Sequence, residues 1–157
     1  MEKLVIYTDG GCSGNPGPGG WAFVILDGKR EIGFSGSDRY TTNNKMELTA
    51  VISALKYVIL NFPDAEAAVY TDSEYVKNGI TQWIKKWLIN GWRTADRKPV
   101  KNMELWQQLY DCSNAVNPSW HWVKGHAENE KNNRCDQMAV ASANSDNLLD
   151  DTGFQEV

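Results

Sequence analysis

The sequence has no long apolar run, few histidines and an odd number of cysteines. No stretch of its 157 residues approaches the roughly 20 consecutive apolar residues of a membrane span. The N-terminus, MEKLVIYTDGG, enters a predicted strand at once and carries no evident signal peptide. The three cysteines, Cys12, Cys112 and Cys135, lack metal-ligand spacing. This favours reduced thiols and a cytoplasmic protein.

The composition is typical of a soluble globular protein. Hydrophobic residues make up 41% of the chain and charged residues 23%, and the length suits one domain with a substantial core. There is no repeat and no linker. We therefore expect a single domain over residues 1–145, followed by a flexible acidic tail over residues 146–157. This tail contains no base and four acids: Asp146, Asp150, Asp151 and Glu156.

The charge is unevenly distributed. A net charge of −4, taken alone, argues against a nucleic-acid partner, because phosphates bind cations. Between residues 77 and 101, however, the chain has seven Lys or Arg and one acid, Asp96. This stretch is either a basic patch on an acidic body or a solvated helix face.

Hydrophobic periodicity and turn residues predict an α/β domain. A hairpin through Asp27-Gly28 joins the second and third strands, and a helix between the first and fourth strands implies a right-handed parallel crossover. A break is expected at Gly79 and another at the NGW stretch of residues 90–92. The predicted strands are 3–9, 21–27, 31–36, 66–71 and 119–123, and the predicted helices are about 44–60, 73–80, 82–90, 102–112 and 130–143.

Two of the predicted strands end in the same pair of residues, Thr-Asp. YTDGG at residues 7–11 follows KLVI, and YTDSE at residues 70–74 follows AAV. Aspartate is depleted in strands and is costly to bury without a partner. If the two strands are parallel neighbours, Asp9 and Asp72 emerge at the same carboxyl edge, where open α/β sheets bind ligands.

Two further acids, Glu47 and Asp136, lie on predicted helices. Glu47 shares a helix face with apolar residues three, four and seven positions further on, so it points inward near the edge of the sheet. Asp136 is a poor helix former inside the last predicted helix. Taken singly, each acid can be explained by local structure as well as by chemistry, but all four together are harder to explain by local structure.

Structural interpretations of three of these acids stay open. Asp9 is also a candidate turn residue, Asp72 a candidate helix N-cap, and Glu47 a candidate capping-box partner of Asn44. Four converging carboxylates, in contrast, repel one another unless a cation lies between them. A hard divalent cation, Mg²⁺ or Mn²⁺, fits an all-oxygen ligand set. Two such ions about 4 Å apart support phosphodiester cleavage.

The Gly-rich loop GNPGPGG is not a phosphate cradle of the Walker type. Pro16 and Pro18 lack N–H donors, and no Gly-Lys-Ser/Thr follows. A stiff connection to the next strand is the favoured interpretation, although Asn15 within it can contact a nucleic-acid backbone.

The chain has two histidines. His121 lies between Trp120 and Trp122 on a predicted strand, where a structural role is favoured. His126 lies in the predicted loop before the last helix, ten residues ahead of Asp136. It is a candidate proton shuttle to the leaving group.

The sequence resembles bacterial ribonuclease HI over nearly its whole length. The resemblance lies in YTDGGCSGNPGPGGW, TTNNKMEL, YTDSEYV, GITQWI, GWRTADRKPVKN, LWQQL, WVKGHA and RCDQMA. It implies a ribonuclease H-like fold: a five-stranded mixed sheet, its first three strands antiparallel and the rest added in parallel, with helices on both faces. It also implies an endonuclease that hydrolyses the RNA strand of RNA–DNA hybrids without sequence specificity, leaving 3′-hydroxyl and 5′-phosphate ends.

The resemblance also implies roles for individual residues. The metal ligands are Asp9, Glu47, Asp72 and Asp136, which hold Mg²⁺ or Mn²⁺, two ions when substrate is bound, and His126 is a mobile base. The residues expected to contact substrate are Gly10, Asn15, Thr42, Asn43, Asn44, Glu74, Trp83, Lys85, Lys86, Arg97 and Lys98. We call residues 82–101 the basic protrusion, a handle for the DNA strand. Trp83 either packs there or stacks on a deoxyribose.

Two departures from the family pattern bear on substrate binding. Glu74 stands where a glutamine is expected, and Leu88, Ile89 and Asn90 stand where a more basic run is common. Both changes remove positive charge or add negative charge near the expected substrate. Two alternatives have the same fold or partner: a DNA strand transferase or junction nuclease, and a non-catalytic hybrid-binding module. The intact WVKGH stretch and the basic protrusion argue against the first alternative, and the retention of all four acids argues against the second. We therefore expect a hydrolase, which we also expect to be monomeric and cytoplasmic.

Overall fold

The fold begins with a three-stranded antiparallel meander of β1 (Lys3–Cys12), β2 (Gly17–Asp27) and β3 (Arg30–Thr41). A computed structural model of the chain describes residues 3–28, 30–123 and 138. Gly28 follows β2 with a φ of 61°, a conformation that suits glycine, and the predicted hairpin is confirmed. All three strands extend beyond their predicted bounds, because Gly19 and Gly20 pair with both neighbouring strands instead of belonging to a loop.

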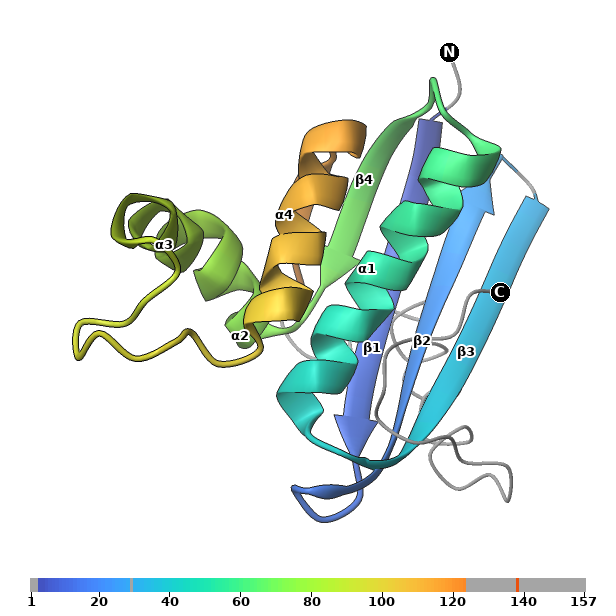
Figure 1. The fold of residues 1–157 in the computed structure, drawn as a ribbon. Coiled ribbons are helices and arrows are strands. Elements are labelled where there is room, and N and C mark those ends of the chain that lie inside the picture. Colours follow the sequence, from blue (N-terminus) through green and yellow to red (C-terminus); the bar gives the residue numbers. More distant parts are fainter. Residues whose placement is uncertain (1–2, 29, 124–137, 139–157) are drawn as a thin grey trace.

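Two parallel strands complete the sheet. Helix α1 (Asn43–Asn61) leads from β3 to β4 (Glu66–Thr71), which pairs with β1 in parallel. Strand β5 (Ser119–Trp122) pairs with β4 in parallel, and the strand order is β3-β2-β1-β4-β5. The predicted mixed sheet is therefore confirmed, and Figure 1 shows β4 beside β1. The last predicted helix, residues 130–143, lies outside the described residues.

The chain between β4 and β5 forms a helical excursion. Helix α2 (Glu74–Asn78), a π-helical turn η1 (Gly79–Trp83) and α3 (Ile84–Asn90) follow one another without a break. The predicted break at Gly79 is wrong, since its φ of −63° and ψ of −48° are helical. A Cβ at Gly79 would lie 1.9 Å from Cη2 of Trp106, so this glycine makes room for a ring. The predicted break after Asn90 is confirmed, because Gly91 ends α3 with a φ of 66°.

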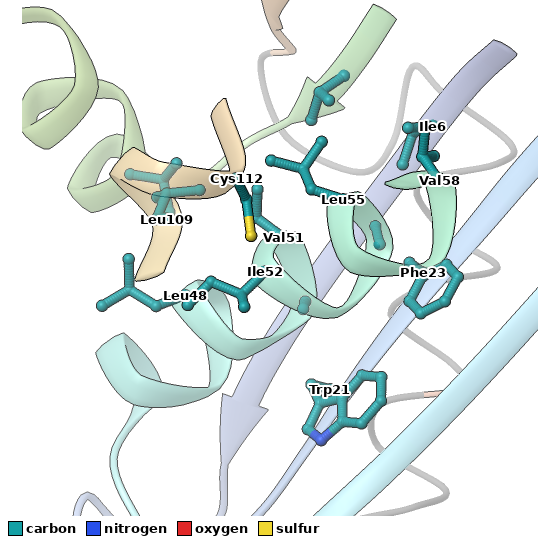
Figure 2. Packing of buried hydrophobic residues seen from close by; sticks show 14 of the residues in the cluster. Ile6, Trp21, Phe23, Leu48, Val51, Ile52, Leu55, Val58, Leu109 and Cys112 are labelled. Atoms are coloured by element: carbon teal, nitrogen blue, oxygen red, sulfur yellow. The ribbon is translucent and has the colours of Figure 1, made fainter. Parts of the chain in front are cut away.

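The core lies between the sheet and the helices α1 and α4 (Met103–Val116). Every residue from Leu48 to Leu55 is buried, because the sheet covers one side of α1 and α4 covers another. Figure 2 shows Leu109 and Cys112 of α4 on one side of α1, and Trp21 and Phe23 of the sheet on another. None of the helices in the described part of the chain is long and apolar enough to cross a membrane.

Candidate active site

Asp9 and Asp72 come from neighbouring parallel strands. The pairing of β1 with β4 runs to Tyr7 opposite Tyr70, and the two tyrosine rings stack with their centroids 5.1 Å apart. Continuing this register by two residues places Asp9 level with Asp72. Because strand side chains alternate with a period of two, Asp9 within β1 projects from the face that carries Tyr7.

Neither aspartate has the local role that the structural interpretation gave it. Asp9 lies inside β1, opposite Ala22, so it is not a turn residue, and the prediction that it ends the strand is wrong by three residues. The N-cap of α2 is Ser73, whose hydroxyl accepts a hydrogen bond from the Val76 N–H at 3.1 Å. Asp72, directly after β4, is therefore not the cap.

Glu47 on α1 accepts a hydrogen bond from Ser73, which lies two residues after the end of β4. The N-cap of α1 is Thr42, which accepts from the Lys45 N–H at 3.2 Å, so Glu47 is not part of a capping box with Asn44. The Ser73 hydroxyl donates a hydrogen bond to Glu47 Oε2. Burial raises the pKa of Glu47, and the nearby charge of Asp72 raises it further against the opposing effect of Ser73. A cation bound beside these two acids would lower the pKa of Glu47 and favour its charged form.

Gly10 lets helix α1 approach strand β1. A Cβ at this position would lie 2.3 Å from the carbonyl carbon of Met46 and 2.6 Å from the backbone nitrogen of Glu47. Real Cβ atoms do not tolerate backbone atoms at such distances. The glycine that follows Asp9 therefore permits the contact that brings Glu47 to the edge of the sheet.

The described residues contain part of the predicted ligand set. Among residues 3–28, 30–123 and 138, no group of three or more His, Cys, Asp or Glu side chains is arranged to hold a metal ion. Asp136 and His126 lie outside these residues. The donors that are described, Glu47 and Asp72 close together and Asp9 level with Asp72, are all carboxylates, and they fit a hard divalent cation.

Replacing Glu47 by Gln is expected to stabilise the metal-free protein. Since burial raises the folded-state pKa of Glu47, its charge destabilises the fold at neutral pH, and this cost disappears as the pH falls through the folded-state pKa. In chelator at pH 7 we expect Glu47→Gln to raise the Tm by about 2–4 °C, equivalent to roughly 1 kcal/mol. The gain should vanish below the ordinary glutamate pKa. It should shrink with Mg²⁺, which stabilises the wild type preferentially. A lower Tm in chelator would show that Glu47 is a satisfied structural residue.

The loop after β1 is joined to the start of α1. The Cys12 N–H donates to Asn43 Oδ1 at 2.7 Å, and the Asn43 N–H donates to Asn15 Oδ1 at 3.2 Å. Three of the predicted substrate contacts, Asn15, Thr42 and Asn43, are thereby brought together at the start of α1. Asn44, another predicted contact, is exposed. These polar groups form a rim next to the carboxylates.

A pocket of about 340 Å³ opens beside Asp72. Its walls come from the start of α2 and the end of β5, and the described residues that line it are Thr71, Asp72, Ser73, Glu74, Lys77, Trp122 and Val123. Glu74 and Lys77 are exposed. Sequence reasoning missed Ser73, Lys77 and Trp122. Ser73 could have been found, because serine before a helix is a preferred N-cap.

The basic protrusion carries exposed cations on a packed aromatic base. Lys85 and Lys86 on α3, and Arg97 and Lys98 after it, are all exposed. Trp83 meets Trp106 edge to face with ring centroids 6.3 Å apart, and it packs on Tyr75 in the same way at 5.6 Å. Trp83 therefore packs, as one of its two interpretations predicted. Figure 1 shows α3 projecting from the body of the molecule.

The mixed sheet and the acidic edge of β1 and β4 define an α/β enzyme with a site suited to a divalent cation. A family model described as RNase H matches residues 1–144, and the chain belongs to this family. The Ribonuclease H of Ehrlichia canis (strain Jake) is 54% identical over 139 residues, which cover 88% of this chain and 93% of that protein. The predicted family, fold and hydrolytic endoribonuclease activity are thus confirmed.

Two solved structures show the same fold. LC9-RNase H1, a type 1 RNase H with the type 2 active-site motif, superposes with a TM-score of 0.82 at 28% identity, covering 91% of this chain and 72% of that one. LC11-RNase H1 in complex with an RNA/DNA hybrid gives 0.66 at 28% identity, covering 89% of this chain and 96% of that one. The fold is therefore shared beyond the closely similar sequences.

Proposed function

We propose that this chain cleaves the RNA strand of RNA–DNA hybrids at the carboxyl edge of β1 and β4, with Asp9, Glu47, Asp72 and Asp136 holding Mg²⁺ or Mn²⁺. The observation that carries the proposal is the proximity of Asp72 to the half-buried Glu47, whose pKa is raised by burial and by the charge of Asp72. Asp9 lies on the neighbouring strand, level with Asp72 when the strand register is continued. The hybrid complex of LC11-RNase H1 supports the substrate class. The bound ions, two with substrate, supply activation of a water molecule and stabilisation of the leaving oxygen.

The chain's own residues position these ligands. Ser73 links two roles through one hydroxyl, because it caps α2 and donates to Glu47. The orientation of the Glu47 carboxylate is therefore tied to the start of α2, one residue after Asp72. His126 is proposed to carry a proton to the leaving oxygen during turnover.

The substrate is proposed to lie across the rim and the basic protrusion. Gly10, Asn15, Thr42, Asn43 and Asn44 provide backbone and amide groups on one side of the carboxylates. Glu74, beside the pocket, is proposed to contact the hybrid on the other side. Such contacts need no base readout, since hybrid and duplex DNA differ in 2′-hydroxyls and backbone shape.

Neutralising the basic protrusion is expected to weaken hybrid binding and to flatten its salt dependence. Lys85, Lys86, Arg97 and Lys98 are exposed, so their replacement by Gln removes phosphate contacts with little effect on packing. Each lost contact should reduce the log–log salt slope by roughly 0.7–0.9. The measurement is the Kd for a labelled hybrid in chelator at several salt concentrations.

A control variant with two substitutions distinguishes loss of phosphate contacts at the basic protrusion from a change in the protein's net charge. Lys3 and Arg30 are exposed at the start of β1 and β3, at the opposite end of the sheet from Asp9. Lys3→Gln with Arg30→Gln should leave the slope unchanged. An equal log–log salt slope for the wild type and the variant with four substitutions would show that the basic protrusion is a solvated face.

A substrate panel tests the proposal as a whole. Labelled hybrid, duplex RNA and duplex DNA are each incubated with Mg²⁺ and with chelator. We expect cleavage of the hybrid's RNA strand, and only in the presence of Mg²⁺. We also propose that the enzyme is monomeric and cytoplasmic. Cleavage of duplex DNA, or hybrid binding without cleavage, would favour one of the two alternatives.

A further inference from the structure

Helix α3 presents an apolar pair to solvent. Ile89 is 85% exposed and Leu88 is 45% exposed. Lys85 lies three and four positions before them, on the same side of the helix, and Lys86 is also exposed. We call Lys85, Lys86, Leu88 and Ile89 the α3 tip. It is a surface that is both basic and apolar.

A nucleic acid backbone uses only half of this surface. Phosphates attract Lys85 and Lys86. The exposed side chains of Leu88 and Ile89 contribute favourable binding free energy only when an apolar partner removes their surface from water. The ligand that suits the whole α3 tip is therefore anionic and apolar together.

The chain itself contains such a segment. Residues 146–157 hold Asp146, Asp150, Asp151 and Glu156 and no base. Between these acids lie Leu148, Leu149 and Phe154. The acids complement the two lysines of the α3 tip, and the leucine pair complements its apolar pair.

The segment can reach the α3 tip. Met138 packs at Gly33 on β3, with its Cε 3.2 Å from the position of a Cβ there. Strand β3 is at one edge of the sheet, and α3 projects beyond the other side (Figure 1). Four strand spacings of about 4.8 Å take roughly 19 Å. The ten residues from Met138 to Leu148 can span up to roughly 35 Å when extended.

We propose that residues 146–157 bind the α3 tip and compete with the hybrid for it. The leucine pair covers Leu88 and Ile89, and the acids occupy the cations that would otherwise meet phosphates. The tail is then a built-in competitor that lowers hybrid affinity. This inference rests on the proposed role of the basic protrusion in hybrid binding.

The contact is tested directly with a fluorescent peptide of residues 144–157. The protein is the full chain carrying Leu148→Ser and Leu149→Ser, which frees the α3 tip without changing the charge. An attached segment is present at an effective concentration of about 1 mM, so a useful competitor needs a peptide Kd of about 0.2 mM or tighter. We expect fluorescence anisotropy to give a peptide Kd of about 0.2 mM or tighter. Adding Ile89→Ser to the protein should raise this Kd at least about fivefold. Leu60→Ser is the control, since Leu60 is 73% exposed on α1. No binding, or equal loss with Leu60→Ser, overturns the proposal.

The competition is tested with hybrid in chelator. A 1 mM effective concentration and a 0.2 mM Kd predict that Leu148→Ser with Leu149→Ser tightens hybrid binding about sixfold. Ile89→Ser should tighten it similarly, and the combined variant should show no further gain, because both changes break one contact. Unchanged affinity or additive gains overturn the competition. Failure here leaves RNA cleavage in the substrate panel intact, so the two proposals fail distinguishably.

Discussion

Asp72→Asn is expected to lower the cleavage rate by at least about 100-fold while hybrid affinity stays nearly unchanged. Asp72 lies level with Asp9 at the carboxyl edge when the strand register is continued, and its charge acts on the half-buried Glu47. Asparagine keeps the shape and an oxygen donor but cannot neutralise a cation. The substitution also leaves the N-cap of α2 intact, because Ser73 performs that role. The loss should therefore appear in kcat, with the fold preserved.

The measurement is single-turnover cleavage of a labelled hybrid in Mg²⁺, together with its Kd in chelator. Asp64→Asn is a matched control, since it removes one negative charge from an exposed position after α1. The control should cleave at the wild-type rate. If Asp72→Asn retains more than about a tenth of wild-type turnover, Asp72 does not belong to the metal site.

Local patterns in the sequence were enough to predict much of the fold. Short apolar runs predicted β1 and β4. A helical period predicted α1, whose bounds differ from the prediction by one residue at each end. The parallel pairing of β1 with β4 followed from the crossover helix. This pairing is what made the two Thr-Asp endings informative, because it converts a similarity in sequence into proximity in space.

Features that depend on distant contacts were not predictable. Gly79 was expected to break a helix, but the ring of Trp106, far along the chain, occupies the space beside it. Periodicity assigned α1 one buried face, whereas Leu48 and Ile52 are buried as well because α4 packs there. The hydrogen bond from Ser73 to Glu47 joins two elements whose separation no local pattern encodes.

Gly10→Ala is expected to be strongly destabilising, because it places a methyl group against the backbone of α1. The added Cβ would lie 2.3 Å from the Met46 carbonyl carbon and 2.4 Å from its oxygen, and a helix backbone cannot give way as a flexible side chain can. Helix α1 is buried over consecutive residues, so it has little room to shift. We expect a loss of about 3 kcal/mol or more in the free energy of unfolding, at the upper end for overpacking.

Gly11→Ala is the matched control, because a Cβ there would meet only Asn43 Oδ1 at an ordinary 3.7 Å. Urea unfolding in chelator should show Gly11→Ala within about 1 kcal/mol of wild type, the size of a typical point substitution. Because the Gly10 methyl also meets the Glu47 backbone nitrogen at 2.6 Å, cleavage by Gly10→Ala should fall even where the variant is fully folded. A Gly10→Ala protein as stable and active as Gly11→Ala would show that β1 and α1 separate at little cost. Glu47 would then not be held at the edge of the sheet by this contact.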